Sequence, residues 1–324
     1  MTSRFEKFVK QYAIIFVFIA LVIVFSILSP AFLTVFNAMN IIRQISMMGI
    51  VTVGFTFVLI AGGLDLSVGS QIAIMNVAVA YMIVNIGVNP ILAAILGIAL
   101  TTGIGWFNGF VITKTGIPPL IGTLAMQTAL RGATFLITQG YPIHGIPEAM
   151  KYIGQGNLFG VIPIPGIIMI LIIAFGIILL TKTYIGRHFY ALGSNTEATR
   201  LAGINIHFTR TMTYALLGFL TGIAGLIMLC RTGSAQPNIA VGFEMNVLTA
   251  AVLGGVSVNG GKGNIPGAII GAAIIGMLNN GMSIIGANDY WQQVITGIVL
   301  FAVVVFDSLN RTRGKSPRKL VSKE

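Results

Sequence analysis

Long apolar runs, separated by short polar or glycine-rich breaks, cover most of this chain. A helix needs about 20 apolar residues to cross the hydrocarbon of a bilayer. The pattern predicts ten membrane-spanning helices, of which the eighth is short: residues 12–28, 45–61, 68–86, 90–112, 118–138, 166–181, 209–229, 243–255, 266–285 and 290–306. The expected fold class is an all-α polytopic membrane protein, forming one domain over residues 1–324 with a membrane core at 12–306. Residues 32–40 are amphipathic and are expected to lie at the membrane interface.

Composition agrees with this interpretation. Of the 324 residues, 56% are hydrophobic and 8% are charged, whereas a soluble domain is about 25% charged. The single cysteine, Cys230, excludes an internal disulfide framework.

The net charge of +11 is concentrated on one predicted side of the membrane. Ten spans place both termini on that side, together with 15 of the 19 basic residues: Arg4, Lys7, Lys10, Lys114, Lys182, Arg187, Arg200, Arg210, Lys262, Arg311, Arg313, Lys315, Arg318, Lys319 and Lys323. Because basic residues favour the cytoplasmic side, we expect both termini, the loop 184–208 and the basic tail 307–324 to be cytoplasmic. The charge therefore indicates an inner-membrane protein and no nucleic-acid partner.

The loop 184–208 is the longest interior segment that cannot lie in hydrocarbon. Within it, Ser194 and Glu197 fit a capping box, and Gly203 stands where a helix would end. These signals predict a short surface helix over residues 195–202. The helix could simply join two spans, or it could contact a partner.

Two glycine-rich breaks, residues 62–67 and 258–264, interrupt the spans. The backbone N–H and C=O groups of such a break cannot face lipid, so they must be buried in protein or hydrated. Asp65 in the first break and Arg131 in the fifth span are costly near hydrocarbon. Either could line a solute pathway or serve a structural role, and Asp65 is the only credible carboxylate for proton coupling. Neutral amides in the spans suit an uncharged solute or helix–helix contacts: Gln71, Asn76, Asn108, Gln127, Asn246, Asn279 and Asn280.

No enzyme motif is present in the sequence. The three histidines are scattered, and the glycines at 260–263 lack the first glycine and the Ser/Thr of a phosphate-binding loop. We expect no catalytic residue, bound cofactor or metal, and any ATP and Mg²⁺ would be used by a separate chain.

Several motifs resemble those of a known family. Residues 62–70, GGLDLSVGS, resemble the GG[IL]DLSVGS signature of bacterial ABC sugar permeases, and residues 187–204 are similar to the RxxYAxGxNxxATRLxGI segment of the ribose branch. The stretches SAQP at 234–237, VLGG at 252–255, GGKG at 260–263 and LNNG at 278–281 also match. The broader EAAxxxG coupling motif is matched less well, because Thr199 replaces its second alanine.

The resemblance implies the type II importer fold, a second permease copy, two ABC ATPase subunits and an extracytoplasmic sugar-binding protein. It also implies an ATPase-coupling site at Gly193, Ser194, Asn195, Glu197, Ala198, Arg200, Leu201 and Gly203. The pathway candidates are Asp65, Arg131, Asn279 and Asn280. The expected function is translocation of a ribose-like pentose or similar monosaccharide. The alternatives are a secondary transporter or facilitator for a small polar solute, and a membrane scaffold.

Overall fold

The computed structural model describes residues 18–314, with only the backbone described for 289, 303 and 306–314. After a first helix, Phe18–Leu28, the helices of the chain are α2 (Val35–Ile60), α3 (Val68–Tyr81), the π-helix η1 (Met82–Ile86), α4 (Pro90–Thr115), α5 (Pro119–Thr138), α6 (Glu148–Gln155), α7 (Ile164–Lys182), α8 (Tyr184–Ser194), α9 (Thr196–Leu201), α10 (Ile206–Thr232), α11 (Phe243–Leu253), α12 (Ile265–Ile284) and α13 (Asp289–Gly314). Four two-residue strands complete the fold: β1 (Ile143–His144), β2 (Asn157–Leu158), β3 (Ile162–Pro163) and β4 (Ser234–Ala235).

The all-α membrane fold predicted from the sequence is confirmed. Among the described residues, 7 helices are long and apolar enough to cross a membrane, and Phe243–Leu253 is the short apolar helix expected in eighth place. The second predicted span begins earlier than residue 45, because α2 begins at Val35 and runs without a break to Ile60; most of the segment 32–40, expected at the membrane interface, is therefore the start of this helix. Residues 12–17 of the predicted first span and residues 315–324 of the predicted tail lie outside the described part of the chain. The start of that tail belongs to α13, which ends at Gly314.

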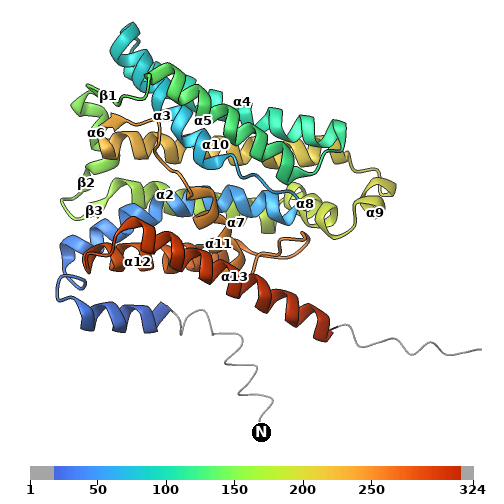
Figure 1. Cartoon of the computed structure of the whole chain (residues 1–324). Coiled ribbons are helices and arrows are strands. Elements are labelled where there is room, and N and C mark those ends of the chain that lie inside the picture. The colour runs from blue at the N-terminus through green and yellow to red at the C-terminus, as the bar shows by residue number, and fades with distance from the viewer. Residues whose placement is uncertain (1–17, 315–324) are drawn as a thin grey trace, which may run out of the picture.

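The helices run side by side, so that the connections gather at two ends of the molecule (Figure 1). One end carries α8, α9 and the two glycine-rich breaks. The opposite end carries α6 and the short strands, with β1 paired to β4 and β2 paired to β3. The predicted spans leave residues 139–165 and 230–242 without a predicted element, because two-residue strands and one short amphipathic helix leave little periodicity to detect.

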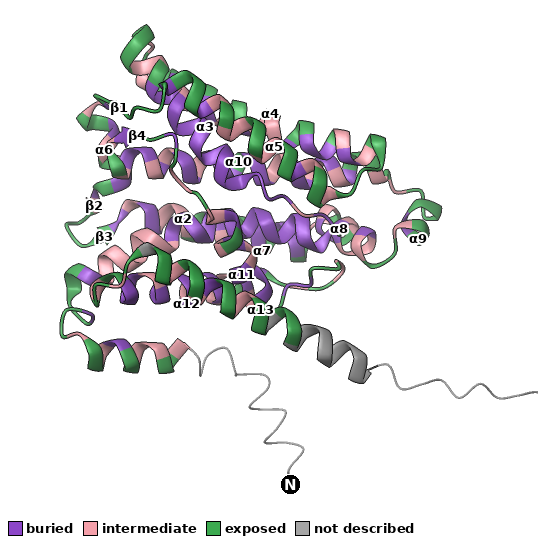
Figure 2. Cartoon of the chain, in the orientation of Figure 1, coloured by how far each residue is buried: buried purple, intermediate pink, exposed green. Residues whose placement is uncertain are grey.

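The core lies around α2 and α10. Every residue of α2 from Ser46 to Ile60 is buried (Figure 2), as expected for a helix that is apolar all round. The helix α10 packs against α2, α3 and α4. Glycines let α4 and α10 approach closely: a Cβ atom at Gly105 would overlap the carbonyl oxygen of Tyr214, and one at Gly109 would lie 2.8 Å from the Cα of Thr211. Small residues at such contacts are a common device of membrane helix packing.

Candidate functional site

The helices α8 and α9 form the loop between α7 and α10 at one end of the molecule (Figure 1). Thr183 starts α8, where its Oγ1 accepts a hydrogen bond from the backbone nitrogen of Gly186. Phe189 and Leu192 are buried, and the Phe189 ring lies 6.0 Å from that of Phe57 in α2. The apolar face of α8 therefore anchors this loop on the helical core.

The start of α9 differs from the sequence prediction. Its N-cap is Asn195, whose Oδ1 accepts a hydrogen bond of 2.9 Å from the backbone nitrogen of Ala198. Ser194 is the last residue of α8, so the predicted capping box between Ser194 and Glu197 was wrong. Ser and Asn are both good N-cap residues, and the pattern could not show that α8 occupies the first of them.

The end of α9 is where the sequence placed it. Gly203 adopts φ +78°, the left-handed conformation that glycine tolerates best. Its nitrogen donates to the Arg200 carbonyl over 3.0 Å, and the nitrogen of Ile204 donates to the Thr199 carbonyl over 3.3 Å. These two bonds form the Schellman motif that ends a helix, which explains why the chain turns sharply here into α10.

The outer face of α9 is open to its surroundings (Figure 2). Glu197 and Arg200 form an ion pair of 2.9 Å in which both side chains are largely exposed, and such pairs contribute little to stability. Ala198 is exposed, and Leu201 is 82% exposed. Buried Thr199 faces the other way. The short helix thus presents two charges and a large apolar side chain on one projecting surface.

Asp65 lies in the first glycine-rich break and is fully buried. Its Oδ1 accepts from the backbone nitrogen of Ser67 over 2.9 Å and from the Ser67 hydroxyl. Its Oδ2 lies 3.3 Å from the Gln71 amide nitrogen and 3.4 Å from that of Asn108. This hydrogen-bonded carboxylate holds the break against α3 and α4. These bonds give Asp65 a structural role, although it does not cap α3, whose N-cap is Ser67 without a side-chain bond.

Arg131 of α5 holds the segment that precedes α11. Its Nη1 donates to the carbonyl oxygens of Pro237 and Ile239, over 2.7 and 2.8 Å. Nearby, Gln127 donates to Glu244 of α11 over 2.8 Å. Glu244 is buried, so it is a second buried carboxylate beside Asp65 in the described part of the chain. The sequence did not single out Glu244, because it stands at the start of a short helix next to a loop.

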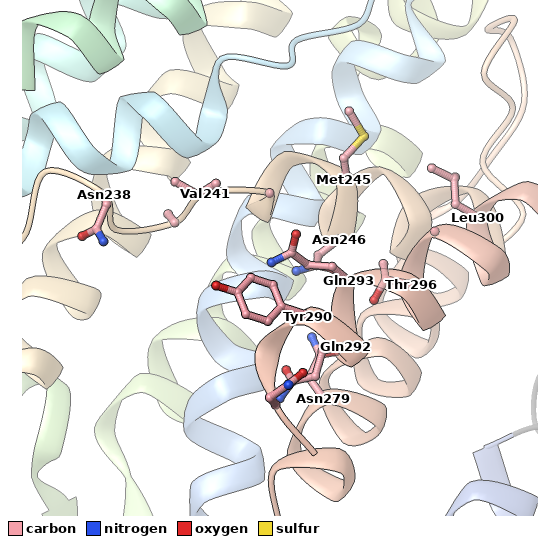
Figure 3. A pocket seen from close by; sticks show the side chains of 14 residues that line it. Asn238, Val241, Met245, Asn246, Asn279, Tyr290, Gln292, Gln293, Thr296 and Leu300 are labelled. Carbon is pink, nitrogen blue, oxygen red and sulfur yellow. The ribbon is translucent and has the colours of Figure 1, made fainter. Parts of the chain in front are cut away.

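A cavity of about 950 Å³ lies between the 238–246 segment and α12 and α13 (Figure 3). The lining residues whose side chains the structure describes are all uncharged: Asn238, Ala240, Val241, Gly242, Met245, Asn246, Asn279, Asn288, Tyr290, Gln292, Gln293, Thr296, Gly297 and Leu300. Six of these residues carry an amide and two a hydroxyl, groups that both donate and accept hydrogen bonds. The walls can therefore bind a neutral, hydroxyl-rich solute.

The structure separates the four pathway candidates. Asn279 lines the cavity, whereas Asp65, Arg131 and Asn280 are not among the lining residues. Asn280 instead donates to Asn37 of α2 over 3.0 Å and lines a second, smaller cavity of about 380 Å³.

Of the seven span amides singled out in the sequence, five bond to protein groups: Gln71, Asn76, Asn108, Gln127 and Asn280. The other two, Asn246 and Asn279, line the larger cavity. Sequence reasoning missed Asn238, Tyr290, Gln292, Gln293 and Thr296. The last four of these lie in the first two turns of the predicted span 290–306, where several polar residues in an otherwise apolar helix could have indicated a site.

The comparisons with known proteins fit this architecture. Residues 37–304 match the family model described as a branched-chain amino acid transport system / permease component. The chain belongs to this permease family, and it is a multi-pass membrane protein. It is 43% identical to the ribose import permease protein RbsC of Bacillus subtilis (strain 168), over 89% of each chain.

Two further relatives come from Escherichia coli (strain K12). The chain is 37% identical to the L-arabinose transport system permease protein AraH, over 94% of this chain and 92% of that one. It is 34% identical to the D-allose transport system permease protein AlsC, over 94% of each. The resemblance to sugar permeases of the ribose branch is thereby confirmed. No solved structure matches the chain.

Proposed function

We propose that this chain is the permease subunit of an ATP-driven importer that translocates an uncharged monosaccharide, a ribose-like pentose or similar sugar. The observation that carries this proposal is the large cavity whose described lining residues are all neutral. Amides and hydroxyls can match the hydroxyls of a sugar, which donate and accept in the same way. An amino acid is a zwitterion at neutral pH, and burying its charges without partners would be costly.

In this proposal the energy comes from a separate ABC ATPase, which uses ATP and Mg²⁺, while this chain binds no cofactor. The ATPase would dock on α9 through Glu197, Ala198, Arg200 and Leu201. The exposure of Leu201, at 82%, suits a surface that a partner covers. Gly193, Ser194, Asn195 and Gly203 would set the position of that surface, since they frame α9 at its two ends.

The proposed orientation follows from the basic residues at the two ends. Six basic residues whose side chains are described belong to the α9 end: Lys114, Lys182, Arg187, Arg200, Arg210 and Lys262. Three belong to the opposite end, which are Arg43, Lys151 and Arg231. The basic excess supports a cytoplasmic α9 end, and the ten predicted spans would place both termini on the same side. A sugar-binding protein would then dock on the opposite, extracytoplasmic end, and a second permease copy would complete the pathway.

A secondary transporter is less well supported. Proton coupling favours a carboxylate that reaches the solute. Asp65 and Glu244, the two buried carboxylates of the described residues, are both absent from the cavity lining.

Reconstitution tests the proposal directly. The permease, the partner ATPase and the binding protein are placed in proteoliposomes, and uptake of labelled ribose, arabinose and leucine is measured with and without ATP. We expect uptake of a sugar that requires ATP and all three components. Uptake driven by an ion gradient without the ATPase, or uptake of leucine alone, would contradict it.

A further inference from the structure

Three backbone segments meet at the end of the molecule that carries α9. They are the end of α2, the end of α8 and the loop between α11 and α12. The nitrogen of Gly261 donates to the carbonyl oxygen of Ile60 over 2.8 Å. A Cβ atom at Gly193 would overlap that same oxygen and would lie 2.6 Å from the nitrogen of Gly261. We call Gly62, Gly193, Gly260 and Gly261 the glycine junction.

The junction leaves no space for side chains between the three segments. A Cβ atom at Gly260 would lie 2.9 Å from both the Gly193 carbonyl oxygen and the Gly62 Cα. One at Gly261 would lie 2.5 Å from the Ser194 hydroxyl oxygen. The backbones therefore touch directly, and no flexible side chain can absorb a displacement of one segment against the others.

A side-chain hydrogen bond secures the same contact. Tyr190 of α8 donates from its hydroxyl to the carbonyl oxygen of Gly263 over 2.8 Å. Burial raises the pKa of the Tyr190 phenol above its ordinary value of 10.0. The phenol therefore remains protonated, and able to donate, at neutral pH.

The segments that meet here lead to different parts of the protein. Gly193 lies two residues before the N-cap of α9. Ile60 is the last residue of the buried helix α2, and the loop with Gly260 and Gly261 leads into α12, which carries Asn279 on the cavity. A displacement of α9 that reached Gly193 would thus push on α2 and α12 together.

We propose that Gly193 and Tyr190 are positioning residues that transmit movement of α9 to the membrane helices that enclose the cavity. The proposal rests on the proposed docking of an ATPase at α9. It adds that transmission depends on direct backbone contact at the glycine junction, separate from the docking surface itself.

The test uses Gly193→Ala and Tyr190→Phe in the complete transporter in proteoliposomes. The added methyl group must separate Gly193 from Ile60, while Tyr190→Phe removes one hydrogen bond and adds no volume. The matched controls are Gly103→Ala, whose Cβ would meet nothing within 4 Å, and Tyr141→Phe at an exposed residue of the opposite end. Three quantities are measured: co-purified ATPase, ATP hydrolysis stimulated by loaded binding protein, and sugar transported per ATP hydrolysed.

We expect both junction variants to retain the ATPase. The sugar transported per ATP should fall roughly fivefold in Tyr190→Phe, which corresponds to about 1 kcal/mol, and further in Gly193→Ala. A merely structural role would lower abundance and leave this ratio unchanged. An unchanged ratio in Tyr190→Phe, which should fold whether or not Gly193→Ala does, overturns the proposal. Loss of ATPase binding in both variants overturns it too, because the junction would then be a docking element. Failure of the ATPase to bind the wild-type permease would refute the proposed function instead.

Discussion

The hydroxyl of Tyr214 in α10 binds both backbone polar groups of Leu64 in the first glycine-rich break. It accepts from the Leu64 nitrogen and donates to the Leu64 carbonyl oxygen, each over 3.2 Å. Tyr214 is fully buried, so water cannot replace these bonds. One phenol therefore satisfies backbone that would otherwise be unpaired between two membrane helices.

Replacing Tyr214 with phenylalanine should destabilise the protein. The change leaves the nitrogen and carbonyl oxygen of Leu64 buried without this partner, at a cost of about 1–3 kcal/mol for each unsatisfied group. Thermal unfolding of the purified permease in detergent measures the effect, with Tyr141→Phe as the exposed control. An unfolding temperature equal to that of the wild type would show that the bonds to Leu64 carry no stability.

Replacing Gly63 with leucine should reduce the amount of assembled permease in the membrane. A Cβ atom at Gly63 would lie 2.7 Å from the Tyr214 hydroxyl oxygen and 3.0 Å from a methyl group of Val58, and crowding of this kind typically costs about 1–3 kcal/mol. Quantitative blotting of membranes and sugar uptake measure the result, with Gly103→Leu as the control. Normal abundance together with normal uptake would show that the backbone at this break does not require glycine at position 63.

The two adjacent asparagines of α12 should respond differently to leucine. Asn280→Leu removes the bond to Asn37 and leaves a buried acceptor unpaired, so stability should fall by about 1–3 kcal/mol. Asn279 faces the cavity, and its Oδ1 has no hydrogen-bond partner in the described part of the protein. Asn279→Leu should therefore lower sugar uptake at normal abundance. Thermal unfolding and sugar uptake are measured for both variants. Loss of stability in Asn279→Leu together with loss of uptake alone in Asn280→Leu would contradict a pathway through this cavity.

The orientation of the chain can be tested with single cysteines. In a Cys230→Ala background, Ala198→Cys on α9 should resist an impermeant thiol reagent in whole cells and react after permeabilisation. Tyr141→Cys at the opposite end should react in whole cells, because Tyr141 is 75% exposed. Labelling of Ala198→Cys in intact cells would show that α9 lies outside the cell and that the proposed topology is wrong.

The sequence was most informative where a local pattern decides the structure. Apolar runs predicted the spans, because a membrane helix must be apolar over its whole length. Gly203 predicted the end of α9, because a left-handed residue there favours glycine. The start of α9 was misplaced, since Ser194 and Asn195 are equally good caps and only tertiary packing extends α8 through Ser194.

The candidate site depends on contacts that no local pattern contains. Asn238, Asn279 and Tyr290 reach one cavity from three separate segments. Likewise, Gly62, Gly193 and Gly261 are far apart in the sequence, and only the folded backbone brings them together. The sequence shows the glycine-rich breaks, but it does not show which backbone segments those glycines contact.

In the proposed function, α9 couples this permease to a separate ATPase. Gly203→Pro removes the left-handed stop of α9 and the backbone donor to Arg200, because proline fixes φ near −65° and has no N–H. The matched control is Gly87→Pro, which changes a glycine of the same left-handed conformation, φ +78°, at the opposite end. Glu197→Arg provides a second variant, which reverses a charge on the α9 surface and removes the ion pair with Arg200.

The measurement is ATPase co-purification alongside sugar uptake, at matched membrane abundance of each variant. The account predicts that Gly203→Pro and Glu197→Arg lose bound ATPase and uptake together, while Gly87→Pro retains the ATPase. Wild-type uptake and wild-type ATPase binding in both α9 variants would contradict the coupling role.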